Sequence, residues 1–492
     1  MGFKVDSSFL RYLTMGARGT RQVIAELEGL GFEPIELERY CTSNKIWATK
    51  VKRLRLPDLI CVKTGLKVEV RAKSALTIKM SDAPANPDRV WDAGAEDEDV
   101  VAFIACRNGP GGPFPADHAA YFDIGSLRRS ARKSILGPAK SASEGAERDR
   151  TWPSTVPKRS GTVLSVTRDK LLVQMEEPAR KQSFNVAGRN VYVAAGDRFE
   201  AGMTFLAGVP DRMADLSPHL ARRYDPVKGL RSARAVDRYA AAKAVRFRPE
   251  REQAALPLLE RALKSEREAR VALEVAGTAT ALGLAAGQGR IADFLWSDDA
   301  ADLSMEAILI LTEIGGDFAR EQLAQLAADP DFEGDERRQA AIWGLGKAGV
   351  KAYHDLLPYL NDADENVAFH AIAAFGHDTP RPIVQRLVRA LSNGEPSLAP
   401  AASEALRVIG GRKVLEVLVK AIEQSGSDFA WGMATLGRLE PKLVREGLRG
   451  SPLLAQLEPM LLMAHGANWL TAEDAVVNFA FLLKQDLYAP VN

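Results

Sequence analysis

Residues 56–73, LPDLICVKTGLKVEVRAK, combine acidic and basic side chains at spacings that place them together. Two short apolar runs, LICV and LKVEV, flank a Thr-Gly step, and this pattern predicts a β-hairpin. Asp58 opens the first run, and Glu69 lies in the second with Arg71 and Lys73 at alternate positions, which share one face of a strand. Two carboxylates beside a cation at one sheet edge would form a hard-oxygen site suited to Mg²⁺.

The order Pro57-Asp58, a turn and then Glu69-Val70-Arg71 resembles the PD-(D/E)XK nuclease superfamily over roughly residues 15–135. The resemblance implies a mixed α/β core that hydrolyses phosphodiesters with one or two divalent metal ions. The flanking segments are similar too, with an amphipathic helix in GTRQVIAELEGLG before the hairpin, strands in VVAFI and AAYFDI after it, and a closing basic helix in SLRRSARKS.

This resemblance implies roles for the residues of the hairpin. Asp58, Glu69 and the backbone carbonyl of Val70 would hold Mg²⁺ or Mn²⁺, and Lys73 or Arg71 would orient water or stabilise developing charge. The family has a lysine two residues after the acid, where this chain has Arg71, which stays protonated and cannot act as a base. Lys73, on the same strand face, would then take the lysine's role.

Many members of the superfamily also carry a glutamate in the first helix, and Glu26 is the residue available here.

Positive charge is concentrated around the hairpin. Residues 1–160 carry a net charge of +6, and between Lys45 and Lys79 there are 10 basic residues but only two acids, Asp58 and Glu69. Such a field would attract a phosphodiester backbone, although a lysine-rich solvated strand edge gives the same pattern. The residues expected to contact nucleic acid are Lys50, Lys52, Arg53, Arg55 and Lys79.

Two other charged segments stand out. Arg222 to Arg251 holds 10 basic residues and three acids, for a net charge of +7. Asp92 to Asp99, DAGAEDED, reads as a solvated acidic loop, with a metal or partner contact as the alternative. Trp47 and Trp91 are expected to pack in the core rather than to stack on bases.

Composition excludes several classes of protein. No apolar run is long enough to span a membrane, and the amino-terminal segment is too charged for a signal peptide, so a cytoplasmic location is expected. Three cysteines without zinc or disulfide spacing indicate neither a structural metal nor a disulfide framework. No phosphate-binding loop occurs, and the six histidines are not spaced as zinc ligands.

The chain is long enough for about three domains. The resemblance at the amino terminus and the strand and helix patterns that follow it together imply a multidomain α+β protein. Residues 1–135 would form the nuclease-like mixed α/β core, and residues 136–158, rich in Ser, Ala, Gly and Pro, a linker. Residues 159–212 read as short strands of a small all-β, barrel-like domain whose turns lie at Gly196 and Gly202. Residues 225–490 read as a helical domain.

The helical part repeats with a period of about 31 residues. Segments end in a small residue and Gly, and Gly suits the left-handed position after a helix. The acidic pairs at 335–336 and 364–365 would begin helices. The pattern resembles the short HEAT or phycobilin-lyase-like α-solenoid class, in which Trp343, Trp431 and His370 would be packing residues. The repeat markers are Gly283, Gly315, Gly346, Gly376, Gly410 and Gly437.

Two functions follow as hypotheses. The first is a Mg²⁺- or Mn²⁺-dependent nuclease, with DNA as the expected substrate and the repeats as a scaffold for a protein partner or for nucleic acid, in genome defence or repair. The second is a catalytically inactive nuclease-like domain that only binds nucleic acid and protein. The sequence leaves open DNA versus RNA, strandedness, the partner and the oligomeric state.

Overall fold

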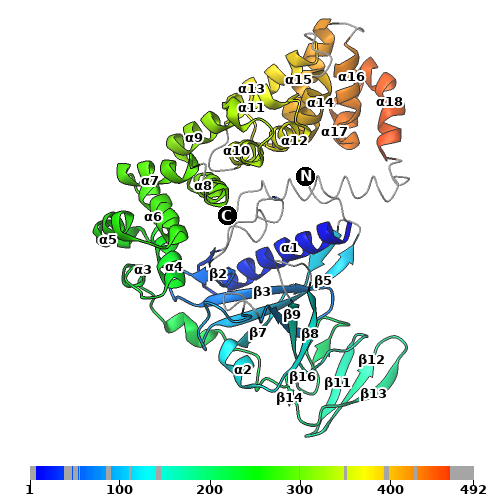
Figure 1. Cartoon of the computed structure of the whole chain (residues 1–492). Coiled ribbons are helices and arrows are strands. Elements are labelled where there is room, and N and C mark those ends of the chain that lie inside the picture. Colours follow the sequence, from blue (N-terminus) through cyan, green and yellow to red (C-terminus); the bar gives the residue numbers. More distant parts are fainter. Residues whose placement is uncertain are drawn as a thin grey trace. The chain divides into compact units, whose positions relative to one another are not determined.

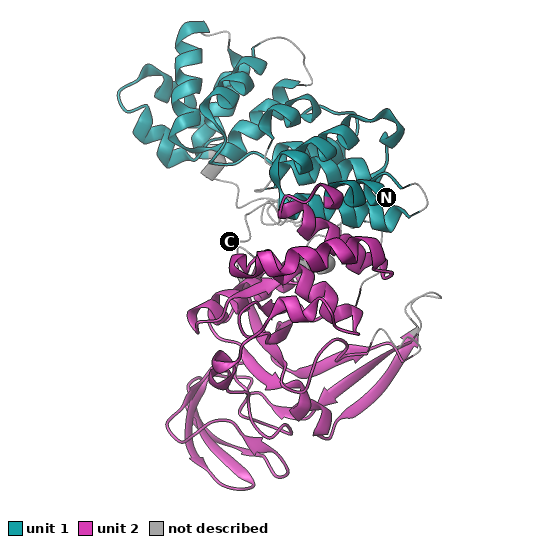
Figure 2. Cartoon of the chain, turned by 90° about the vertical axis from the view of Figure 1, so that its left-hand side faces the viewer, with its two compact units in different colours: residues 1–7, 47–51, 288–492 teal, residues 8–46, 52–287 magenta. Residues whose placement is uncertain are grey.

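The structure is a computed structural model that describes residues 7–37, 47, 54, 56–84, 90–109, 112–139, 146–297, 300–347, 352–392, 398–425 and 429–465. The chain divides into two compact units, which are described separately. One comprises residues 8–46 and 52–287, and the other comprises residues 1–7, 47–51 and 288–492 (Figure 2).

The first unit is built on a six-stranded mixed sheet with the order β1-β2-β3-β5-β6, in which β7 also pairs with β5. β3 and β5 are parallel and the other pairs are antiparallel, as in the hairpin predicted for β2 and β3. The strands are β1 (Pro34–Glu36), β2 (Leu59–Cys61), β3 (Lys67–Lys73), β5 (Val100–Gly109), β6 (Gly112–Pro115) and β7 (Ala120–Asp123).

Helix α1 (Ser7–Gly29) covers one face of this sheet (Figure 1). Its residues Val23 and Leu27 are buried in one core with Val68 and Val70 of β3. The helix lies so close to the sheet that a Cβ added at Gly19 would lie 2.7 Å from the Cβ of Ala72. The helix and the β5 and β7 strands expected from the sequence are therefore confirmed.

The other face of the sheet packs against a second, three-stranded sheet, β4-β9-β8, in a core that contains Phe103 of β5. Trp152 is fully buried in this core and donates from its indole nitrogen to the carbonyl of Leu127, 2.8 Å away. The strands of the second sheet are β4 (Ile78–Asp82), β8 (Lys133–Ala139) and β9 (Ala146–Trp152), and helix α2 (Ile124–Arg129) packs in the same core.

Two sequence predictions are wrong here. The segment predicted as a linker, residues 136–158, includes part of β8, all of β9 and β10 (Ser154–Thr155). It looked like a linker because β9 is polar, but Arg148 and Arg150 both bind the buried carboxylate of Asp82 in β4, at 2.9 Å. The predicted basic helix is also shorter, because α2 ends at Arg129 and strand β8 follows.

The small all-β region forms two sheets, β13-β12-β11-β15 and β10-β16-β14. Positive φ angles of 95° at Gly196 and 72° at Gly202 agree with the predicted turns. Phe205 of this region contacts Phe103 and Phe122 in the core of the main sheet, so the region is not an isolated spacer. The strands are β11 (Gly161–Val166), β12 (Lys170–Met175), β13 (Arg180–Asn185), β14 (Asn190–Val191), β15 (Arg198–Phe199) and β16 (Ala207–Gly208).

The first helices after residue 225 belong to the same unit as the main sheet, so the domain boundary predicted at 225 does not match the packing. Leu37 and Ile60 are buried together with Tyr239 and Leu259 of these helices. Their apolar partners are therefore strand residues, which a helical repeat pattern cannot reveal. The helices after residue 225 in this unit are α3 (Pro226–Gly229), α4 (Ala235–Val245), η3 (Pro249–Arg251), α5 (Glu252–Ser265) and α6 (Ala269–Ala281), and they are preceded by η2 (Ser217–Ala221).

The second unit is helical. Helices α8, α10, α12, α14, α16 and α18 contact one another in succession, and α13, α15 and α17 form a second row, as expected for stacked helical repeats. Its helices are α7, which begins in the first unit (Ala285–Leu295), α8 (Ala301–Ile314), α9 (Gly316–Ala328), η4 (Pro330–Phe332), α10 (Glu336–Gly346), α11 (Tyr353–Leu356), η6 (Leu357–Tyr359), α12 (Glu365–Ala373), α13 (Arg381–Ala390), α14 (Leu398–Ile409), α15 (Gly411–Ser425), α16 (Ala430–Gly437), α17 (Pro441–Gly447) and α18 (Pro452–His465).

Local signals for the ends of these helices were largely correct. Asp335 and Asp364 are N-caps whose carboxylates accept backbone N–H groups at 2.7 and 2.9 Å. Three repeat markers have the expected positive φ, namely 83° at Gly283, 65° at Gly315 and 58° at Gly410. The markers at 346 and 437 are instead the last residues of α10 and α16.

Aromatic residues of this unit behave as predicted with one exception. Trp343 and His370 are buried, and Trp47 contacts both of their rings. Trp431 is 39% exposed, because it stands at the second position of α16 and outside the seam between helices, so its assignment as a packing residue is wrong. Within the described residues, no helix has the length and hydropathy to cross a membrane.

Candidate functional site

The β2–β3 hairpin places Asp58 and Glu69 on one face of the sheet. The turn uses Gly65 at a φ of 76°, which only Gly adopts readily. The ladder pairs Leu59 with Val68 and Ile60 with Lys67. Continued by one residue, this register sets Asp58 opposite Glu69, and opposed residues in an antiparallel pair project to the same side.

The Asp58 carboxylate binds the backbone of the neighbouring strand. It accepts the N–H of Val70 at 2.6 Å, and Asp58 is the residue directly before the start of β2. Pro57 precedes this position and has no N–H to continue the ladder, so the side chain takes the place of a paired strand. Because the N–H and C=O of one strand residue point to the same edge, the Val70 carbonyl also faces the Asp58 side.

Glu69 forms an ion pair with Arg71, two residues along the same strand face. The Glu69 side chain is 17% exposed and the Arg71 side chain 36% exposed. The two carboxylates proposed as metal ligands thus have different partners, a backbone amide for Asp58 and a guanidinium for Glu69.

Lys73 completes this face of β3. Burial, followed by the positive charges of Arg71 and Lys79, lowers the pKa of the Lys73 ammonium from 10.5 to about 8, with Asp149 opposing the shift. A lysine with a pKa near neutrality can give up and take back a proton at physiological pH, which an ordinary lysine rarely does.

Glu26 of the first helix lies on the opposite face of the sheet from Glu69. Its carboxylate accepts from the backbone N–H of Ala119 at 2.9 Å and from the Tyr121 hydroxyl at 3.0 Å, and it contacts His118. Tyr121 belongs to the core under α1. Glu26 therefore ties α1 to β7 and does not join the Asp58–Glu69 face.

Much of the positive charge counted around the hairpin is neutralised in the fold. Of the five described basic residues in the 45–79 segment, four form ion pairs, leaving Lys73. The pairs are Lys63–Glu33, Lys67–Asp237, Arg71–Glu69 and Lys79–Asp149. Lys50, Lys52, Arg53 and Arg55 lie outside the described residues.

The acidic segment at 92–99 is solvated at Glu96, Asp97 and Glu98, as predicted, but its acids also make structural contacts. Asp92 and Asp97 both bind Arg128, and Asp99 accepts the backbone N–H groups of Lys67 at 3.0 Å and Glu96 at 2.7 Å. Burial raises the pKa of Asp99 to about 6. Sequence alone could not identify this role, because the cations that neutralise the loop lie in other elements.

The described residues contain no larger group of metal-binding side chains. Within that part of the chain, no group of three or more His, Cys, Asp or Glu side chains is placed to hold a metal ion. A site at the hairpin would therefore rest on two carboxylates and the Val70 carbonyl.

Comparison with known proteins gives no family. No family model matches the chain, and no curated protein matches it. Among solved structures, a designed armadillo repeat protein is 19% identical, covering 49% of this chain and 98% of that chain with a TM-score of 0.19. An engineered protein is 17% identical, covering 46% of this chain and 98% of its own with a TM-score of 0.19. We draw neither fold nor function from similarities at this level.

Proposed function

We propose that the first unit is a metal-dependent nuclease domain of the PD-(D/E)XK kind that hydrolyses phosphodiester bonds of DNA. The observation that carries the proposal is the placement of Asp58 and Glu69 on one face of the hairpin, with the Val70 carbonyl at the same edge. Lys73, with its pKa of about 8, lies on that face as well.

The donor set fits a hard divalent cation. Two carboxylates and a backbone carbonyl are oxygen ligands of the kind that Mg²⁺ and Mn²⁺ prefer. When bound, the ion would supply Lewis-acid activation of the phosphodiester and of water. To serve as ligands, Asp58 has to exchange its bond to the Val70 amide, and Glu69 its ion pair with Arg71.

The basic residues of β3 have separable roles in this proposal. Lys73 takes a proton from the attacking water, because its lowered pKa leaves a substantial neutral fraction near pH 8. Arg71, once released from Glu69, keeps its positive charge and stabilises the negative charge that develops on the phosphate. Lys79, on strand β4 of the second sheet, holds a flanking phosphate once it is released from Asp149.

The helices of the second unit would act as a scaffold that presents a protein partner or a long nucleic acid. Stacked helical repeats commonly form extended binding surfaces. A nuclease combined with such a scaffold suits genome defence or DNA repair, a suggestion that rests on analogy between domain combinations alone.

A second function is favoured by the same contacts. The Arg71–Glu69 pair, with Arg71 at the position where the family has lysine, leaves Glu69 neutralised by its own strand. The alternative is therefore a catalytically inactive nuclease-like domain that binds nucleic acid and protein without cleaving.

The test is a panel of single-stranded and duplex DNA and RNA, incubated with Mg²⁺ or Mn²⁺. The double variant Asp58→Ala/Glu69→Ala should lose metal-dependent cleavage, whereas the matched loss of two exposed carboxylates, Asp169→Ala/Glu260→Ala, should leave it unchanged. A double variant that cuts as well as the parent would show that the site is elsewhere. Binding without turnover by the parent would establish the inactive scaffold instead.

A further inference from the structure

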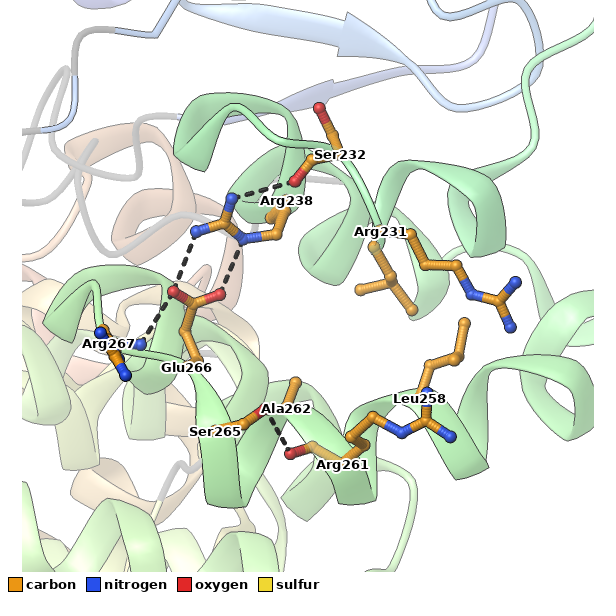
Figure 3. A pocket seen from close by; sticks show the side chains of 10 residues that line it. Arg231, Ser232, Arg238, Leu258, Arg261, Ala262, Ser265, Glu266 and Arg267 are labelled. Atoms are coloured by element: carbon orange, nitrogen blue, oxygen red, sulfur yellow. Dashed lines mark hydrogen bonds and ion pairs between the residues drawn. The ribbon is translucent and has the colours of Figure 1, made fainter.

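A pocket of about 450 Å³ lies in the first unit, among the helices that follow residue 225 (Figure 3). It is formed by the connection between α3 and α4, by α5 and by the turn between α5 and α6. Part of the pocket comes from the basic segment 222–251, whose role the hairpin site does not explain. Its lining residues are Leu230, Arg231, Ser232, Arg238, Leu258, Arg261, Ala262, Ser265, Glu266 and Arg267.

One side of the pocket is a fixed ion pair. Arg238 donates to both oxygens of Glu266, at 2.7 and 2.9 Å, and to the carbonyls of Ser232 and Ala233, at 3.0 Å each. Glu266 also accepts the backbone N–H groups of residues 267 and 268 at 3.0 Å. The charges of Arg238 and Glu266 neutralise each other, so the pair holds this side of the pocket in place and adds no net charge to it.

The remaining charge of the pocket is uncompensated. Throughout the described part of the chain, no ion pair or side-chain hydrogen bond involves the guanidinium groups of Arg231, Arg261 and Arg267, all of which are exposed. Figure 3 shows Arg231 and Arg261 reaching to the same side of the hollow, away from the Arg238–Glu266 pair. Arg267 lies apart from these two, beside Glu266 (Figure 3). Two like charges that reach to one side of a pocket favour an anion that binds between them.

The pocket also has an apolar part. Leu230, Leu258 and Ala262 line it beside the arginines. The volume of about 450 Å³ is within the range of small-molecule sites. Guanidinium groups bind phosphate oxygens in a bidentate manner, and an apolar wall suits the flat face of a base.

We propose that this pocket binds the phosphate of a nucleotide unit, either a free nucleotide or a nucleotide within a nucleic-acid strand. Arg231 and Arg261 hold the phosphate oxygens, Arg267 adds positive charge, and the leucines contact the base or sugar. The Arg238–Glu266 pair holds the α4 and α5–α6 segments in place around the ligand.

This site is independent of the proposed cleavage site. Its residues lie on helices α4 and α5 and on the turns beside them, not on the hairpin, and its binding needs no metal ion. Measurement in EDTA on the Asp58→Ala/Glu69→Ala protein therefore tests the pocket even if the nuclease proposal fails.

The experiment measures binding of pyrophosphate, ATP and a short single-stranded DNA oligonucleotide to the full chain by calorimetry and fluorescence anisotropy. The variant Arg231→Gln/Arg261→Gln/Arg267→Gln should weaken binding about 100-fold, since each charge-assisted hydrogen bond contributes strongly. The control Arg168→Gln/Arg180→Gln/Lys181→Gln removes the same charge from exposed positions near strands β11–β13 and should change binding less than threefold.

The three ligands separate the two sources of phosphate. Loss of ATP and pyrophosphate binding assigns the pocket to a free nucleotide, and loss confined to the oligonucleotide assigns it to a strand. The single variant Arg261→Gln, expected to weaken binding about tenfold, repeats the test should the triple variant be unstable. Equal affinities of parent and pocket variants, or no binding of any of the three ligands by the parent, would overturn the proposal.

Discussion

Two segments of similar charge in the sequence end up electrostatically different in the fold. Residues 45–79 carry 10 basic residues and two acids, and residues 222–251 carry 10 basic residues and three acids. In the first, four of the five described cations are paired, with carboxylates from β9, α4, β3 itself and the residue before β1. In the second, Arg234, Arg238, Arg246, Arg248 and Arg251 form ion pairs, whereas Arg231 has no ion pair with a described residue. Arg261 and Arg267, from outside the segment, line the same pocket as Arg231.

The difference lies in where the compensating acids come from. Lys67 finds Asp237, which is 170 residues away along the chain. Arg238 and Arg246 find Glu266, which follows α5, and Glu274 of α6, each 28 residues away along the chain. A charge count along the sequence therefore gives a poor measure of the field at the surface, because folding neutralises some cations and gathers others. The variants below test that contrast.

The largest effect is expected at the fixed pair of the arginine pocket. Glu266→Ala leaves Arg238 without its bidentate partner and two backbone amides without an acceptor. We expect the free energy of unfolding of the first unit to fall by about 3 kcal/mol. Urea denaturation followed by tryptophan fluorescence measures this change.

Glu260→Ala, at an exposed position of the same helix α5, is the matched control and should change stability by less than about 0.5 kcal/mol. Equal losses for the two variants would mean that the Arg238–Glu266 pair does not organise the pocket.

An intermediate effect is expected at the hairpin. Asp58→Ala removes a carboxylate that accepts the N–H of the buried Val70, so stability should fall by about 1–2 kcal/mol. Glu69→Ala breaks a partly exposed ion pair and should cost less than about 1 kcal/mol. Denaturation of the two single variants, compared with the parent, checks the order; a larger loss for Glu69→Ala would contradict the contacts described for Asp58.

The smallest effect concerns the proton on Lys73. Because its pKa in the folded protein is about 8, the folded state binds this proton more weakly than the unfolded chain does. Its contribution therefore destabilises the fold below pH 8. Stability rises between pH 8 and 10.5, where the folded protein has lost the proton and the unfolded chain still holds it.

Arg71→Ala removes one of the charges that lower the pKa of Lys73, so this pKa should move up toward 10.5. NMR titration of isotopically methylated lysines reports the midpoint directly. Arg180→Ala, far along the sequence on β13, serves as the control, and an unchanged Lys73 midpoint in Arg71→Ala would place the origin of the shift in burial and Lys79.

The sequence alone determined those features that depend on neighbouring residues along the chain. Apolar periodicity located α1, the β2–β3 hairpin, β5, β7 and the repeated helices, and Asp335 and Asp364 cap their helices as their positions indicated. The alternation of Glu69, Arg71 and Lys73 placed them on one strand face, as the burial pattern of β3 shows. These patterns depend on neighbours a few residues apart, which any window of sequence contains.

Only the tertiary structure decided which polar residues became buried and which charges stayed unpaired. The polar sequence of β9 reads as a linker, and one of its two pairing partners, β4, lies more than 60 residues earlier. The bond from Asp58 to the Val70 amide and the cluster of Arg231, Arg261 and Arg267 likewise depend on how separate segments meet. Ion pairing and burial are properties of distance in space, and for these residues that distance is set by the packing of sheets and helices.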